Sequence, residues 1–343
     1  MRKISGLLAS VAILGSALVA GPAAQAAPIA ITGGGSSFAA GIITTCAASY
    51  TTNTVTYTAS SSGTGRSNFA NGSINFAGSD AAYNPTDKKP SGYTYVPIIG
   101  GPVAIMFNIA GVKTLNLDAV TTGAIFSGKI TKWNDAAIKK LNPKAALPDA
   151  TINVNYRSSN SGTTQNFANY LMQNKAADWT VSQSWATASA QKTPVGAGAA
   201  TSAALADKVA STANSIGYAD LVDIKKKSLT VAALKNGAGQ FVQPTAKAAA
   251  AYLAAQAVDV KGKGIVTIDF TKKVNGAYNL SILTYMIAPT DASDTTKAAA
   301  VKDFANYIIK SCAPSKAADL GYVALTGALK SSAQIDRKST RLN

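Results

Sequence analysis

The sequence of 343 residues contains no histidine at all. Histidine is the base in Ser-His-Asp and Cys-His catalysis and the commonest nitrogen ligand of transition metals, so its absence excludes most enzymes and metal sites of those kinds. Acidic residues are also scarce, with 16 Asp and Glu against 32 Lys and Arg, a net charge of +16. A field of that sign attracts anions, and few catalytic mechanisms remain.

Charged residues of both signs make up only 14% of the chain, whereas hydrophobic residues make up 47%. This is a globular composition, and the length suffices for two domains of ordinary size. The basic residues are scattered through Ala-rich stretches, and the longest run, residues 225–227, favours a solvated helix end over a nucleic-acid patch. No base-stacking motif is present, so no nucleic-acid partner is expected.

Long apolar runs are few. The run from Leu7 to Ala20 is short for a membrane span, and it follows Arg2 and Lys3. A small-x-small cleavage site ends at Ala26, so residues 1–26 are interpreted as a signal peptide. No cysteine follows that site, so no lipid anchor is expected. The second run, residues 95–112, contains prolines and glycines and indicates a buried strand. A soluble exported protein, periplasmic or secreted, is the prediction.

Only two cysteines are present, Cys46 and Cys312, 266 positions apart. An oxidising compartment favours one disulfide between them, and two separate buried thiols are the alternative. Two cysteines without histidine fall short of a zinc ligand set, so no metal is expected.

Strand-like and helical stretches alternate along the chain, which predicts an α/β protein. Strands are expected at residues 54–60, 74–80, 95–101, 103–109, 152–158 and 280–288. Helices are expected at 38–50, 117–128, 135–141, 163–174 and 246–257.

Three strand-to-helix junctions are rich in glycine and serine. Ser36 and Ser37 are expected to open one helix, Ser62 with Gly63 to precede a second, and "SGTT" at 161–164 to open a third. Serine is the favoured N-cap, which explains any one junction. Three junctions together, with Arg157 just upstream of the third, indicate anion binding at helix N-termini.

Nucleotide-binding motifs are not satisfied. Residues 60–67 carry Gly-Arg-Ser where a P-loop requires Gly-Lys-Ser/Thr, and residues 63–68 lack the third glycine of a dinucleotide fingerprint. Asp80 follows an apolar strand, at the end where open α/β sheets bind ligands. A plain cap of the next turn is the alternative role for Asp80.

From about residue 31 to residue 324 the chain resembles the periplasmic phosphate-binding proteins of bacterial phosphate ABC transporters. "GGGSSFAA" and "YTASSSGTG" look like the two phosphate loops of that family, and "INFAGSDA" carries its aspartate, 18 residues after Ser62. "RSSNSGTT" keeps the arginine and the Ser-Gly-Thr. "IFSGKITKWNDAAIKKLNP", "TPVGAGAA" and "SIGYADL" resemble segments of the family framework.

The resemblance implies an α/β, type II periplasmic-binding fold, with two lobes joined by two crossover strands and a cleft that closes on its ligand. One lobe would comprise residues 27–105 and 283–335, and the other residues 106–282. Residues 336–343 fit no family end and are interpreted as an artefact or a disordered tail.

The resemblance also implies a site for phosphate without catalytic residues or cofactors. Arg157 would give a bidentate guanidinium, and Asp80 would accept the phosphate O–H and so reject sulfate. Hydroxyls and backbone amides would complete the set, with Phe38 contributing its amide alone. The expected ligand residues are Ser37, Phe38, Ser62, Asp80, Arg157, Ser161, Gly162 and Thr163. The implied partners are inorganic phosphate and an inner-membrane permease, and the protein is expected to be a monomer.

The chain departs from the family at two positions. Familiar members carry an acidic residue two positions after the arginine, where this chain has Ser159, and a threonine where it has Ser37. Either Arg157 is held less rigidly or another group orients it. The alternatives left open are a binder of another oxyanion, a phosphate scavenger without a transporter, a phosphoesterase, and a basic adhesin or nucleic-acid binder.

Overall fold

A computed structural model describes residues 27–191, 193–258 and 265–333. The predicted signal peptide, residues 1–26, and the predicted tail, residues 336–343, lie outside the described residues. None of the helices in the described part is both long and apolar enough to span a bilayer.

The first sheet has five strands in the order β2-β1-β3-β13-β4. β1 runs parallel to β2 and β3, whereas β13 runs antiparallel to β3 and β4. The strands are β1 (Ala30–Gly35), β2 (Thr54–Ala59), β3 (Phe76–Ser79), β4 (Tyr93–Pro102) and β13 (Ser281–Pro289). The accompanying helices are α1 (Ala40–Ser49), α2 (Ser62–Ala70), α10 (Thr295–Tyr307), the π-helix η1 (Ile308–Cys312), α11 (Ala313–Lys316) and α12 (Gly327–Ser332).

The second sheet also has five strands, in the order β10-β5-β9-β7-β8. These are β5 (Ala104–Asn108), β7 (Asn153–Arg157), β8 (Ala197–Ala199), β9 (Ser215–Ala219) and β10 (Thr230–Val231). A small third sheet joins β12 (Phe241–Val242), β11 (Ala233–Lys235) and β6 (Asn116–Leu117). The helices of this region are α3 (Ala119–Phe126), α4 (Ala136–Leu141), α5 (Gly162–Gln173), α6 (Trp185–Ala188), α7 (Ser202–Ser211) and α8 (Leu221–Lys226). Helix α9 (Ala246–Ala254) follows in the chain and contacts β4 and β13 of the first sheet.

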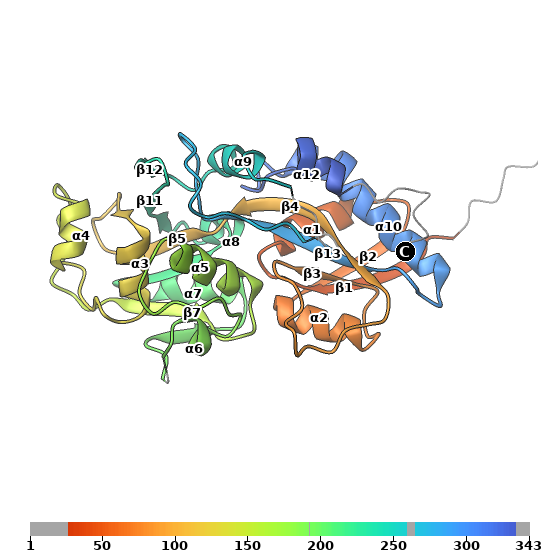
Figure 1. Cartoon of the computed structure of the whole chain (residues 1–343), viewed down its shortest axis with the longest axis horizontal. Coiled ribbons are helices and arrows are strands. Elements are labelled where there is room, and N and C mark those ends of the chain that lie inside the picture. Colours follow the sequence, from red (N-terminus) through yellow and green to blue (C-terminus); the bar gives the residue numbers. More distant parts are fainter. Residues whose placement is uncertain (1–26, 192, 259–264, 334–343) are drawn as a thin grey trace, which may run out of the picture.

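The two large sheets lie toward opposite ends of the long axis of the molecule (Figure 1). The chain leaves the first sheet at the end of β4, enters the second at β5, and returns in β13. β13 is buried along its length except at Pro289, as a continuous apolar run predicts. The α/β prediction is confirmed. The lobe boundaries stay a prediction, and Leu253 of α9 packs over Gly100 of the first sheet although it falls in the segment assigned to the other lobe.

An aromatic cluster fixes α5 against the second sheet. The Phe167 ring stacks on Tyr218 of β9 with centroids 4.6 Å apart, and Trp185 stacks on Tyr156 of β7 at 5.0 Å. The predicted spacing of Phe167, Tyr170 and Leu171 is confirmed, since all three are buried. Large buried rings and edge-to-face pairs of this kind stabilise a core strongly, so the start of α5 is held rigidly.

Two helix starts differ from the prediction. Ser36 and Ser37 do not open α1, because the Ser36 N–H still bonds to the Gly78 carbonyl in the sheet at 2.8 Å, and the helix begins only at Ala40. Ser62 does not precede α2 but is its first residue, since Ser61 is the N-cap.

The two cysteines, Cys46 of α1 and Cys312 of η1, form a disulfide in this structure. The bond therefore joins the first helix of the chain to the C-terminal helices that cover the same sheet.

Candidate functional site

Polar loops from the two sheets meet in the middle of the molecule. We call residues 36–37, 60–63 and 80–84 the β1–β3 loops, since they follow the parallel strands β1, β2 and β3 at one sheet edge. We call residues 157–163, 183 and 200–202 the β7–α7 loops. Seven of the eight predicted ligand residues lie in these loops, and the eighth, Phe38, follows the first of them directly. The six polar side chains among the eight are buried, and so are the Phe38 ring and the Gly162 backbone.

Asp80 is the acidic residue of this site and is 4% exposed. Its Oδ1 accepts hydroxyl hydrogen bonds from Ser36 (2.6 Å) and Thr284 of β13 (2.7 Å), and its Oδ2 accepts one from Thr163 of α5 (3.0 Å). Burial raises the pKa of Asp80 above its ordinary value, and the three hydroxyls and the charge of Arg157 oppose that rise. Asp80 is therefore not a simple cap but the centre of a network that joins both sets of loops.

Arg157 ends β7 and is 1% exposed. Its Nε and Nη2 both donate to the main-chain carbonyl of Ala200, at 3.1 and 2.6 Å, and Nη2 also donates to Ser159 Oγ at 3.0 Å. A further bond at 3.3 Å reaches the Ser60 carbonyl in the β1–β3 loops. At the position where the family pattern has an acid, Ser159 itself donates to the same Ala200 carbonyl at 2.8 Å. A backbone acceptor thus orients the guanidinium.

Of the serine hydroxyls among the predicted ligands, one caps its own helix and the others accept hydrogen bonds from backbone N–H groups of other segments. Ser161 caps α5 by accepting from Thr164 N at 3.2 Å. Ser62 Oγ accepts from Asp80 N at 3.1 Å. Ser37 Oγ accepts from the backbone N–H of Ser202, the first residue of α7, at 3.0 Å. The first amides of α5 and α7 have no intrahelical acceptor, so both helices present positive dipole ends here.

Gly162 lies where the two sets of loops come closest. A Cβ built on it would stand 2.6 Å from Ser62 Oγ and 2.9 Å from Asp80 Cβ. Beside it, the Gly63 N–H donates to the Asn160 carbonyl at 2.9 Å. Only a residue without a side chain allows α5 to approach the β1–β3 loops this closely.

Phe38 is fully buried, and its ring packs edge-to-face on Tyr322 with centroids 5.9 Å apart. The Tyr322 hydroxyl donates to the Phe38 carbonyl at 2.6 Å and to Asp220 Oδ1 at 3.4 Å. The side chain of Phe38 is therefore a core residue, as expected, and its amide stays the predicted contact.

Sequence reasoning missed three contributors to the site: the Thr284 hydroxyl, the Ala200 carbonyl, and the start of α7 at Ser202. It also placed Ser36 at a helix start, whereas its hydroxyl bonds to Asp80. Thr284 lies more than two hundred positions from Asp80 in the chain, and Ala200 acts through its backbone. Only the Thr201-Ser202 pair, at the start of an Ala-rich helix, repeats the serine signal used at the other junctions.

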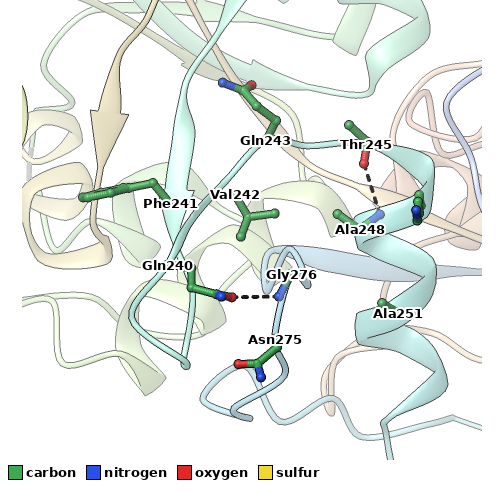
Figure 2. Close-up of a pocket in the computed structure, with 10 residues that line it drawn as sticks. Gln240, Phe241, Val242, Gln243, Thr245, Ala248, Ala251, Asn275 and Gly276 are labelled. Atoms are coloured by element: carbon green, nitrogen blue, oxygen red, sulfur yellow. Dashed lines mark hydrogen bonds between the residues drawn. The ribbon is translucent and has the colours of Figure 1, made fainter.

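The described ranges contain no cluster of three or more His, Cys, Asp or Glu residues able to hold a metal ion. A groove of about 560 Å³ lies elsewhere, between the β11–β12 turn, α9 and the loop at Asn275 (Figure 2). None of the predicted ligand residues lines it. With buried donors, one guanidinium and one carboxyl, the loops are suited to holding an anion that carries a proton.

Residues 22–311 match the model of a family described as "PBP superfamily domain". The phosphate-binding protein PstS of Xylella fastidiosa is 34% identical over 310 residues, which is 88% of this chain and 83% of that protein. In fold the chain is similar to a high-affinity periplasmic phosphate-binding protein solved with phosphate (TM-score 0.70, 22% identity, 89% and 92% of the two chains covered). It is also similar to a phosphate-binding protein from Stenotrophomonas maltophilia (TM-score 0.69, 19% identity, 89% and 92% covered). The chain has the type II periplasmic-binding fold and belongs to the PstS family of phosphate-binding proteins within the PBP superfamily.

Proposed function

We propose that this protein captures inorganic phosphate between the β1–β3 and β7–α7 loops and delivers it to an ABC permease. The observation that carries the proposal is one buried guanidinium, Arg157, and one buried carboxyl, Asp80, inside a shell of hydroxyls and helix N-termini that comes from the loops of both sheets. The relatives named for phosphate binding support the same ligand.

Arg157 supplies the positive charge, and the amides at the starts of α2, α5 and α7 supply neutral donors. Guanidinium and helix-start amides both bind phosphate oxygens well. Ser37, Ser62, Ser161 and the amide of Phe38 belong to the same donor set.

Asp80 supplies selectivity. A carboxylate repels a dianion unless a proton lies between them, and near neutral pH phosphate carries one whereas sulfate does not. Asp80 Oδ2 accepts a single hydroxyl in this structure, and a carboxylate oxygen has room for a second donor. Sulfate would instead face an unpaired buried charge.

The number of donors is sufficient for tight binding. A charge-assisted hydrogen bond contributes roughly 1.5–3 kcal/mol, and micromolar affinity requires about 8 kcal/mol in total. About three to six such bonds would supply that much, and the further donors of the site offset the costs of desolvation and loop ordering.

Export, a monomeric state and the lack of catalysis belong to the same proposal. Residues 1–26 would direct export and be removed after Ala26. The relatives named for phosphate binding support binding without hydrolysis.

Calorimetry of ligand-stripped mature protein tests the proposal with phosphate, arsenate, sulfate and molybdate. We expect one tight phosphate site, a strong loss in Arg157→Ala, and a smaller loss in Asp80→Asn accompanied by binding of sulfate. Lys132→Ala removes an exposed positive charge and is the matched control, with affinity unchanged.

Three results would each refute part of the proposal. Sulfate that competes as well as phosphate in the unaltered protein would refute the role of Asp80. Hydrolysis of a chromogenic phosphate ester by protein free of contaminating phosphatase would make it an enzyme, and salt-sensitive DNA binding that phosphate does not displace would favour a nucleic-acid binder.

A further inference from the structure

Gln183 lies outside every motif recognised in the sequence, yet its side chain is 2% exposed and fully engaged in hydrogen bonds. It sits between α5 and α6, in the β7–α7 loops. Its Oε1 accepts from Arg66 Nη2 of α2 at 2.5 Å. Its Nε2 donates to the Ala82 carbonyl and to Asn84 Oδ1, each at 3.3 Å. All three partners belong to the region of the first sheet.

The main chain of Gln183 is tied to the site itself. Its carbonyl accepts the backbone N–H of Ser161 at 3.1 Å, and Ser161 is the N-cap of α5. One residue therefore holds the start of α5 through its backbone and the opposite loops through its side chain.

Arg66 is a strong anchor for this contact. It is 2% exposed, donates through Nη1 to Ser79 Oγ at 3.2 Å, and forms an ion pair with Asp87 at 3.2 Å. Ser79 immediately precedes Asp80, so the Arg66 guanidinium is attached to the strand end that carries the carboxylate of the site. A charged donor of this kind makes a stronger bond than a neutral one.

We propose that Gln183 is a positioning residue for anion binding, which couples closure of the two sets of loops to presentation of the α5 N-terminus. This inference rests on the proposed function, because it requires that the loops separate when the ligand leaves. Separation would break the three side-chain bonds of Gln183 together with the Gly63–Asn160 and Ser37–Ser202 contacts. The bonds of Gln183 would then stabilise the closed form alone.

The test compares Gln183→Ala with Gln173→Ala. Gln173 is a matched control, because its side chain also donates to one backbone carbonyl, that of Ile268, and accepts from one backbone N–H, that of Phe270. All three residues lie within one predicted lobe. We expect Gln183→Ala to raise the Kd for phosphate about 10- to 100-fold, through faster dissociation measured by stopped-flow tryptophan fluorescence. Gln173→Ala should leave the Kd within about twofold.

Thermal unfolding separates this role from a merely structural one. In Gln183→Ala the ligand-free Tm should stay near that of the unaltered protein, while the rise in Tm on adding phosphate should shrink. Gln183→Glu keeps the acceptor for Arg66 but loses both Nε2 donations, so its affinity for phosphate should lie between that of Gln183→Ala and that of the unaltered protein.

A Kd in Gln183→Ala equal to that of Gln173→Ala would overturn the inference. So would an equal fall in Tm with and without phosphate. If the unaltered protein fails to bind phosphate, the proposed function fails instead, and the two failures are thus distinguished.

Discussion

Replacing Gly162 with alanine tests how closely the two sets of loops meet. The added Cβ would lie 2.6 Å from Ser62 Oγ, 2.9 Å from Asp80 Cβ and 3.0 Å from the Asp80 carbonyl carbon. Ordinary contacts between carbon atoms begin near 3.5 Å, so the loops must retreat by about 0.5–1 Å. Overpacking of this size costs about 1–3 kcal/mol, which corresponds to a Kd for phosphate raised about 5- to 150-fold.

The same change should not lower the stability of the ligand-free protein, because the proposal has the two sets of loops separated in that form. Gly162 is the first residue of α5, where alanine is also a good helix former. Titration calorimetry gives the affinity, and chemical unfolding without phosphate gives the stability. Gly217→Ala is the control, because its Cβ would crowd Val209 and Met106 within the second-sheet region at 2.9 and 3.0 Å.

We therefore expect the two variants to separate. Gly162→Ala should lose affinity while keeping its ligand-free stability, and Gly217→Ala should lose stability in both states. Unchanged affinity in Gly162→Ala would show that the phosphate-bound protein does not bring α5 against the β1–β3 loops, and the geometric reasoning would fail.

Three further changes have expected outcomes. Burial, and then the Asp223 carboxylate, raise the pKa of Asp220 well above 3.8. The folded state therefore binds more protons than the unfolded chain between the ordinary pKa and the raised pKa of Asp220, and stability should fall as the pH rises through that interval. Denaturant titrations from about pH 4 to about pH 8 should therefore show a flatter profile in Asp220→Asn, and an unflattened one would contradict the assignment. Replacing both Cys46 and Cys312 with serine should lower the free energy of unfolding by about 2–5 kcal/mol, and no loss would mean that the bond does not form in solution. Ser159→Ala should weaken phosphate binding by only about 2- to 10-fold in calorimetry, because the main-chain acceptor of the guanidinium remains, and a loss as large as that of removing the arginine would refute this.

The sequence was informative where a local pattern decides the structure. Strand β3 and the position of Asp80 at its end follow from an apolar run and the polar residue after it. Helix α5 follows from the spacing of Phe167, Tyr170 and Leu171, all of which are buried. These features depend on residues close together in the sequence, and hydrophobic periodicity predicts such local structure well.

The parts that escaped prediction depend on contacts between distant segments. Thr284 reaches Asp80 only because β13 returns beside β3, and Gln183 reaches Arg66 only because segments from the two sheet regions meet. Adjacent serines were also ambiguous, since Ser61 and Ser62 have equal capping propensity and the fold alone decides which one caps α2.

The acceptor that holds Arg157 has a consequence for the charge balance of the site. The Ala200 carbonyl has no titratable proton and carries no net charge, whereas a carboxylate in its place would cancel the positive charge of the guanidinium. The arginine is thus oriented without being neutralised, and its full charge remains for an incoming anion. The orientation also cannot be lost by acidification or by exchange of the side chain at position 200, because the backbone supplies it.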